Sequence, residues 1–98
     1  MPRILLSVAS SNVPQQVATT PTLFRTATFF GYSGFNANGT PKNNAATVYI
    51  GINSGECAMP AAAGGTFAYN IQTTQERDNL GNYWYQGTAG DGLYIIYN

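Results

Sequence analysis

Two strand-like runs joined by a glycine-rich turn occupy residues 83–97, which read YWYQGTAGDGLYIIY. Apolar and aromatic side chains recur at every second position in both runs, which is the spacing that places them on one face of a strand. Between the runs, Gly90, Asp91 and Gly92 form a structural turn, because glycine adopts positive φ at little cost and a short aspartate caps its own turn. We therefore expect the two runs to pair as an antiparallel hairpin.

The same period of two recurs upstream, at residues 22–30, 47–52 and 66–71, and we also expect a strand near residues 3–8 and a weaker one near residues 16–20. In the first of these, Leu23, Ala27 and Phe29 share one face, and Phe24 lies on the other. In the second, Val48, Ile50 and Ile52 share a face. These patterns are typical of short strands in a sheet that is covered on at least one side.

The whole pattern predicts an all-β fold, a small antiparallel β-sandwich or jelly roll of about six or seven strands. A chain of 98 residues is long enough for one domain only, so residues 1–98 are expected to form a single domain. No window has a convincing helical period, although residues 75–78 could form one short helical turn. Residues 1–21 supply the first strand, and residues 10–21 form either a weak strand or an arm that lies on a neighbouring molecule.

Residues 31–44 are a long stretch rich in glycine and asparagine. Stretches of this length without regular structure are uncommon and are often functional. Two interpretations stay open: a flexible connection between strands, or a contact loop that orders against a partner with Tyr32 and Phe35 as its anchors. A second loop, residues 59–65, is small and uncharged. The triplet at residues 38–40 matches a glycosylation signal but is better interpreted as a turn.

The chain carries four basic and four acidic residues, which is 8% charged residues against about 25% in an ordinary soluble domain, and its net charge is zero. Such a chain has no basic field to attract nucleic acid. Because ionised groups are depleted at the centres of interfaces, a surface so poor in charge is suited to being covered by other molecules. The composition therefore favours a component of an assembly.

Histidine is absent and Cys57 is the only cysteine, which excludes Ser-His and Cys-His nucleophilic centres and zinc sites built from these residues. We expect Cys57 to be an inert, partly buried thiol. A catalytic carboxylate pair would have to come from the four acidic residues, each of which has an ordinary structural explanation. The sequence therefore predicts no enzyme, no catalytic residue, no metal site and no cofactor. The apolar stretch near residue 4 is too short for a signal peptide or a membrane span, so we expect a soluble protein made in the cytosol.

Aromatic residues make up 13% of the chain, and three of them are consecutive, Tyr83, Trp84 and Tyr85. Alternation puts Trp84 on the opposite strand face from its two neighbours. One interpretation is an exposed platform that stacks on a sugar ring or anchors a protein interface. The other is that Trp84 packs in the core while Tyr83 and Tyr85 lie on its rim.

Four segments carry a resemblance to a known group of proteins: TVYIGINSG at 47–55, Pro60 followed by GGTF at 64–67, NLGNYWY at 79–85, and GTAGDGLY at 87–94. In these segments the chain resembles small virion structural proteins of tailed bacteriophages. The resemblance covers about the C-terminal half. It implies a β-sandwich without enzymatic activity. Several such proteins serve as capsid decoration (cement) proteins, commonly as trimers, and others lie at the head-to-tail or tail-fibre region.

Several expectations follow from this resemblance. The protein would bind the major capsid protein on the capsid surface of the virion, form a homotrimer and stabilise the head, after being made in the host cytoplasm. Neither nucleic acid nor membrane would be a partner. The alternatives are a tail or head-tail junction component, and a glycan-binding module that acts in host recognition. The expected interface residues are Tyr32, Phe35, Tyr83, Trp84 and Tyr85.

Overall fold

The structure is a computed structural model that describes residues 2–70 and 77–98. Within these residues the chain is all-β, and its one helical element is a short 3₁₀ turn. The elements are β1 (Arg3–Ser7), β2 (Gln15–Gln16), β3 (Leu23–Phe24), β4 (Thr26–Phe30), β5 (Tyr32–Phe35), β6 (Pro41–Asn43), β7 (Val48–Gly51), β8 (Met59–Ala61), β9 (Thr66–Asn70), β10 (Asp78–Asn79), the 3₁₀ turn η1 (Leu80–Asn82), β11 (Trp84–Gln86) and β12 (Gly92–Tyr97).

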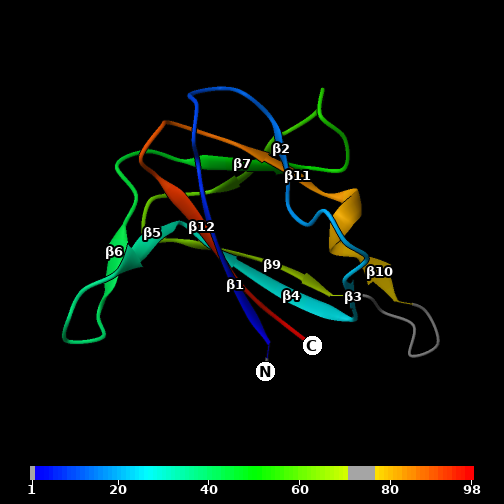
Figure 1. The fold of residues 1–98 in the computed structure, drawn as a ribbon, viewed down its shortest axis with the longest axis horizontal. Coiled ribbons are helices and arrows are strands. Elements are labelled where there is room, and N and C mark those ends of the chain that lie inside the picture. Colours follow the sequence, from blue (N-terminus) through cyan, green and yellow to red (C-terminus); the bar gives the residue numbers. More distant parts are fainter. Residues whose placement is uncertain (1, 71–76) are drawn as a thin grey trace.

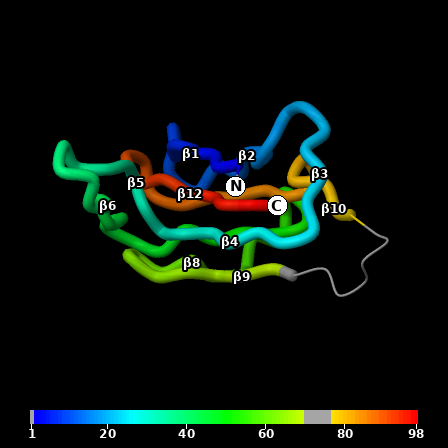
Figure 2. The backbone as a smooth tube through the Cα atoms, turned by 90° about the horizontal axis from the view of Figure 1, so that it is seen from below, coloured from blue at the N-terminus to red at the C-terminus, as the bar shows by residue number. Residues whose placement is uncertain are grey.

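Two four-stranded antiparallel sheets form the layers of a small β-sandwich. The first sheet has the order β1-β12-β4-β9, which can be followed in Figure 1, and the second has the order β2-β11-β7-β8, of which β8 is labelled in Figure 2. Two smaller antiparallel pairs, β10-β3 and β5-β6, complete the described part of the chain. The predicted fold class is confirmed. The strands are more numerous than expected because the run at 22–30 is divided into β3 and β4, and because β5, β6, β8 and β10 form in segments where no strand was predicted.

The predicted hairpin between the last two strands is wrong. β11 pairs with β2 and β7 in the second sheet, whereas β12 pairs with β1 and β4 in the first, so residues 87–91 cross from one layer to the other. Both runs have an apolar face, and in a sandwich such faces gain most when they oppose each other across the core. Tyr85 and Leu93 are accordingly both buried in the core.

The run predicted at 22–30 is divided at Arg25. The N–H groups of Arg25 and Thr26 both donate to the carbonyl of Asn98, at 2.7 and 3.3 Å. Two residues therefore lie opposite one, and the chain has one extra residue between β3 and β4. The extra residue reverses the alternation, and Phe24 points into the core together with Phe29. Leu23 is exposed, so its predicted face was wrong for the same reason.

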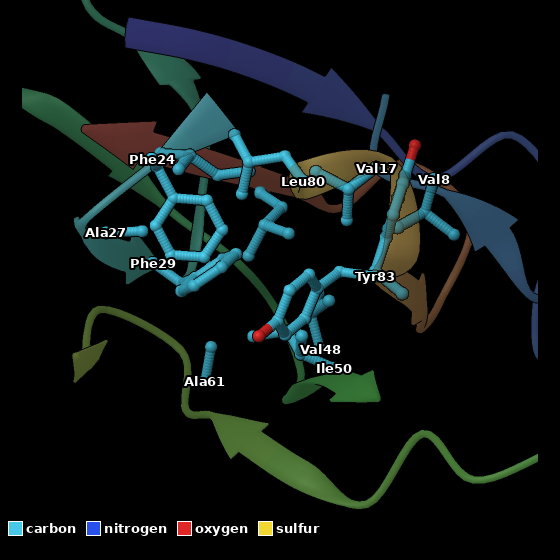
Figure 3. Close-up of a cluster of buried hydrophobic side chains, with 13 residues drawn as sticks. Val8, Val17, Phe24, Ala27, Phe29, Val48, Ile50, Ala61, Leu80 and Tyr83 are labelled. Carbon is cyan, nitrogen blue, oxygen red and sulfur yellow. The ribbon is translucent and has the colours of Figure 1, made fainter. Parts of the chain in front are cut away.

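The core lies between the two sheets and is closed at one end by the segment that carries η1. Figure 3 shows its side chains converging from both layers. The residues of this core are Val8, Val17, Phe24, Ala27, Phe29, Val48, Ile50, Ala61, Leu80, Tyr83, Tyr85, Leu93 and Ile95. Tyr94 is also buried, but outside this cluster. Ile52 is 65% exposed, because β7 ends at Gly51 and the chain turns away.

Residues 31–44 are mostly a hairpin, β5-β6, with a turn at its tip where Gly39 has φ +87°. Figure 2 shows the hairpin at one end of the layered body. The segment 10–21 lies along its own chain: Val17 N donates to the Tyr83 carbonyl at 2.8 Å, and Ala89 N donates to Ser11 Oγ at 2.9 Å. Two residues of the helical turn predicted at 75–78, 75 and 76, lie outside the described residues, and its last residue belongs to β10.

Candidate contact surface

Four aromatic side chains gather on the outer face of the first sheet, and we call them the outer aromatic cluster: Phe30, Tyr32, Phe35 and Tyr94. Phe30 and Tyr94 are register partners on neighbouring strands, with ring centroids 5.8 Å apart. β5 then brings Tyr32 to 5.2 Å from Phe30 in a stacked arrangement, and Phe35 to 5.0 Å from Tyr94 in an edge-to-face arrangement. Offset and edge-to-face pairs at these separations are favourable.

The cluster is open on one side. Tyr94 is only 7% exposed, but Phe35 is 41% exposed, and Leu5, the register partner of Tyr94 on β1, is 49% exposed. One cation borders these rings, because Arg3 Nη1 donates to the Tyr94 hydroxyl at 3.3 Å. The surface formed by Leu5, Phe35 and Arg3 around Tyr94 can therefore supply apolar area together with one positive charge.

The base of the β5-β6 hairpin is held by a buried side-chain amide. Asn44 Nδ2 donates to the Gly92 carbonyl at 2.8 Å, and Gly92 N donates to Asn44 Oδ1 at 2.9 Å. β4 has ended at Phe30, so the Asn44 amide takes the place that a further residue of β4 would have beside β12. No signal in the sequence distinguished Asn44 from the other asparagines.

Asp91 holds the same base from the other side. Its two carboxylate oxygens accept from Ala45 N at 2.9 Å and Ala46 N at 3.1 Å, and the residue is buried. The expectation that Asp91 caps its own turn is therefore wrong, since its partners lie in the segment after β6. Gly90 has φ +94°, as predicted for a turn glycine. Gly92 is needed for a different reason, because a Cβ there would lie 2.6 Å from the Leu6 carbonyl oxygen.

Gly31 fixes the point where the hairpin leaves β4. Its N–H donates to the Gly65 carbonyl at 3.0 Å, and its carbonyl accepts from Asn44 N at 3.0 Å and Gly64 N at 3.2 Å. A Cβ at this position would lie 2.2 Å from the Ala62 carbonyl oxygen, so only glycine fits. The hairpin is thus anchored by backbone and buried side-chain hydrogen bonds, and it extends to one side of the sandwich in Figure 1.

The aromatic triplet at residues 83–85, at the start of β11, is divided between core and surface. Tyr83 and Tyr85 are buried in the core, whereas Trp84 is half-buried on the outer face of the second sheet, beside Gly51 and Gln16 in the register. The interpretation that Trp84 packs in the core with the tyrosines on its rim is therefore wrong. The structure brings Tyr32 and Phe35 together and places Trp84 in the other layer, away from both.

The two buried tyrosines have polar partners. The Tyr83 hydroxyl donates to the Asp78 carboxylate, and the Tyr85 hydroxyl donates to the Ser7 carbonyl at 2.9 Å. Burial, reinforced for Tyr83 by the neighbouring Asp78 carboxylate, raises the pKa of both phenols. Both residues therefore serve the folded core, and their hydroxyls are not available to a partner on the surface.

The acidic residues of the described chain either accept hydrogen bonds from neighbouring groups or are exposed to solvent. Asp78 and Asp91 accept the hydrogen bonds given above, Glu56 is exposed in the turn after β7, and Glu76 lies outside the described residues. Residues 2–70 and 77–98 form no pocket and no group of three potential metal ligands. Cys57 is half-buried, and desolvation raises the pKa of its thiol. In the described residues, the features that a partner could contact are therefore exposed surfaces.

In the described residues, no helix is long and apolar enough to cross a membrane. Comparisons of the chain with protein-family models, with curated proteins and with solved structures find no match.

Two members of the outer aromatic cluster, Phe30 and Tyr94, were not among the residues expected from the sequence. The alternation of their strands does put both on the face opposite the core-facing residues, and this is the signal that could have identified them.

Proposed function

We propose that this chain is a non-catalytic structural protein of a tailed phage virion, most simply a capsid decoration (cement) protein that binds the major capsid protein and stabilises the head. The observation that carries the proposal is the anchored β5-β6 hairpin, which presents the open side of the outer aromatic cluster. Aromatic anchors on a preorganised support bind with a small loss of conformational entropy.

Charge supports a protein partner. Outside the buried and hydrogen-bonded Asp91, the described residues of the hairpin and its base carry only one charge, Lys42, and the neighbouring strand β1 contributes Arg3. A shell protein that places apolar side chains against Phe35 and carboxylates near these two cations would be complementary in both respects. A shell also repeats the same site many times, so even modest contacts of self-associating copies add up through avidity.

Co-sedimentation with heads and with tails, purified separately from the phage that encodes the chain, tests the proposal. The wild-type chain should sediment with heads, and Phe35→Ser should lose at least tenfold in affinity while its circular dichroism spectrum stays unchanged. Ile52→Ser is the matched control, because Ile52 is also an exposed apolar residue but lies outside the cluster. Equal binding by the two variants would overturn the assignment of the surface, and sedimentation with tails alone would favour a tail or head-tail junction component.

A second candidate function rests on the outer face of the second sheet. Trp84 is half-buried there, Tyr49 is exposed on the neighbouring strand, and the side chains of Gln16 and Gln86 lie on the same face by their register. An aromatic ring flanked by amides is suited to stack on a neutral sugar. Trp84 is the only tryptophan, so a change of its fluorescence on addition of host surface glycans would support host recognition, and an unchanged spectrum would speak against it.

A further inference from the structure

Among residues 2–70 and 77–98, the sandwich sheets have four edge strands, and three of them carry a feature that discourages pairing with another chain. β1 contains the charged Arg3, and its Ser7 carbonyl already accepts from the Tyr85 hydroxyl. β2 is only two residues long, and β8 contains Pro60. The fourth edge, β9, is five residues long and contains neither proline nor charge. Among these edges, β9 is therefore the one suited to receive a further strand.

The hydrogen-bond pattern identifies which backbone groups of β9 point away from β4. Thr26, at the start of β4, exchanges two hydrogen bonds with Asn98, so its N–H and C=O point to the β12 side. Backbone groups point to alternate sides along a strand, so those of Phe29 face β9, where the register partner is Phe67. One residue further along β9, the N–H and C=O of Ala68 consequently point away from β4.

The sequence of β9 is self-complementary when two copies run antiparallel about Ala68. It reads Thr66, Phe67, Ala68, Tyr69, Asn70, which is polar, aromatic, small, aromatic, polar in both directions. A twofold axis through Ala68 and perpendicular to the sheet would place Thr66 opposite Asn70, and Phe67 opposite Tyr69, of the second copy. The outward-directed groups of Ala68 would bond to those of the second Ala68.

The aromatic residues of β9 favour a second copy over an unrelated strand. Phe67 and Tyr69 face the core side, and both remain half-buried although they pack against it. In the twofold arrangement they would meet across the new contact in a pair without direct hydrogen bonds, where side chains approach most closely. β9 has no charge, so the contact brings no like charges together.

We propose that β9 pairs with β9 of a second copy of this chain, antiparallel across a twofold axis at Ala68, so that the two first sheets become one continuous sheet. The pairing is independent of the proposed function, because it involves the isolated chain only. It forms a dimer, and a homotrimer of the kind expected from the phage resemblance would require a different, head-to-tail contact.

Sedimentation equilibrium of the isolated full chain over a range of concentrations tests the pairing, with a dimer expected. Ala68→Pro removes an N–H that β4 does not use, so the folded chain should persist while dimerisation weakens at least tenfold. Ala68→Thr is the matched control, because it keeps the N–H and should dimerise like the wild type. If Ala68→Pro does not fold, Ala68→Lys replaces it, since it places two like charges directly opposite each other and should also yield monomers.

Hydrogen exchange supplies a readout at single residues. On dilution to the monomer, the Ala68 amide should exchange at least tenfold faster, whereas the Phe67 amide, bonded to β4, should stay protected at all concentrations. A wild-type chain that is monomeric throughout, a trimer, or a dimer that survives both Ala68→Pro and Ala68→Lys would overturn the proposal. Failure of head binding with an intact dimer would overturn only the proposed function.

Discussion

The molecule contains two aromatic clusters of similar composition in opposite settings. The inner one, Phe24, Phe29, Tyr69 and Tyr83, lies between the sheets with ring centroids 5.7 to 6.4 Å apart, and its phenylalanines are fully buried. The outer aromatic cluster has similar ring separations, 5.0 to 6.3 Å, but it lies outside the first sheet and ends in an exposed phenylalanine.

The difference lies in what holds each cluster in place. The inner cluster is enclosed by both layers, so its position follows from burial of apolar surface. The outer aromatic cluster has one sheet behind it and depends on polar contacts at the hairpin base, where Asn44 and Asp91 are buried. Aromatic content alone thus does not indicate a binding surface. The informative combination is an open cluster whose support consists of satisfied buried polar groups.

The largest effect is expected from Phe24→Ala in the inner cluster. This side chain is fully buried against Tyr69 and Tyr83, so its truncation leaves a cavity and should lower the free energy of unfolding by about 3–5 kcal/mol. Urea unfolding followed by circular dichroism measures the loss. Ile52→Ala, at an exposed position, is the control and should change little. A loss below about 1 kcal/mol would mean that the inner cluster is not the centre of the fold.

Asp91→Ala should have the next largest effect, and it should act on the outer aromatic cluster. The substitution leaves the N–H groups of Ala45 and Ala46 without acceptors and should cost about 2–3 kcal/mol in unfolding free energy. Hydrogen exchange should increase in β5 and β6 before it does so in β12. Asp91→Asn keeps one carbonyl acceptor and should lose about half as much. Uniform loss of protection across both sheets would contradict a local role at the hairpin base.

The sequence predicted the fold class and the core-facing residues of several strands, because alternation in short runs is a local property, whereas Val8, Val17 and Leu80 were not expected in the core. The alternations of 48–50 and 67–69 agree with the observed burial, whereas in β12 Tyr94 is buried as well as Leu93 and Ile95, and the prediction for Ile71 lies outside the described residues. The errors arose where an element depends on distant parts of the chain. The prediction of a hairpin between the last two strands was wrong because β11 pairs with β7, and β12 with β1, both of which are far away in the sequence.

The candidate surface was predictable only in part. Tyr32 and Phe35 stand in a glycine-rich stretch that is unusual in itself, and the structure places both in one cluster. One interpretation left the stretch without regular structure, yet most of it is a hairpin, whose base is held by the hydrogen bonds of Asn44 and Asp91 to groups 45 to 48 residues away in the sequence. Neither the partner of a buried amide nor that of a carboxylate can be read from local sequence.

Tyr83→Phe tests the polar side of the inner cluster. The free energy of unfolding should fall by about 1–2 kcal/mol, because the Asp78 carboxylate loses a hydrogen-bond donor.

The raised pKa of Tyr83 also predicts a pH dependence of stability. A buried phenol stays protonated when the unfolded chain has begun to ionise at its ordinary pKa near 10, so its contribution to stability is complete below that pH and declines above it. Unfolding in urea between pH 9 and 11 should therefore show a decline that is smaller in Tyr83→Phe. Tyr49→Phe, at an exposed tyrosine, should decline like the wild type, and an equal decline in all three proteins would contradict the assignment.

Phe35→Ala should have the smallest effect on stability, although the same kind of ring is removed as in Phe24→Ala. Phe35 is 41% exposed, so truncation removes the contact with Tyr94 and little else, and the free energy of unfolding should fall by about 1 kcal/mol or less. Urea unfolding beside Phe24→Ala gives the direct contrast between the two clusters. If Phe35→Ala were as destabilising as Phe24→Ala, the outer aromatic cluster would be a second core whose aromatic residues are needed for folding. A small loss together with weakened binding to heads would instead mean that Phe35 is held in place for a partner.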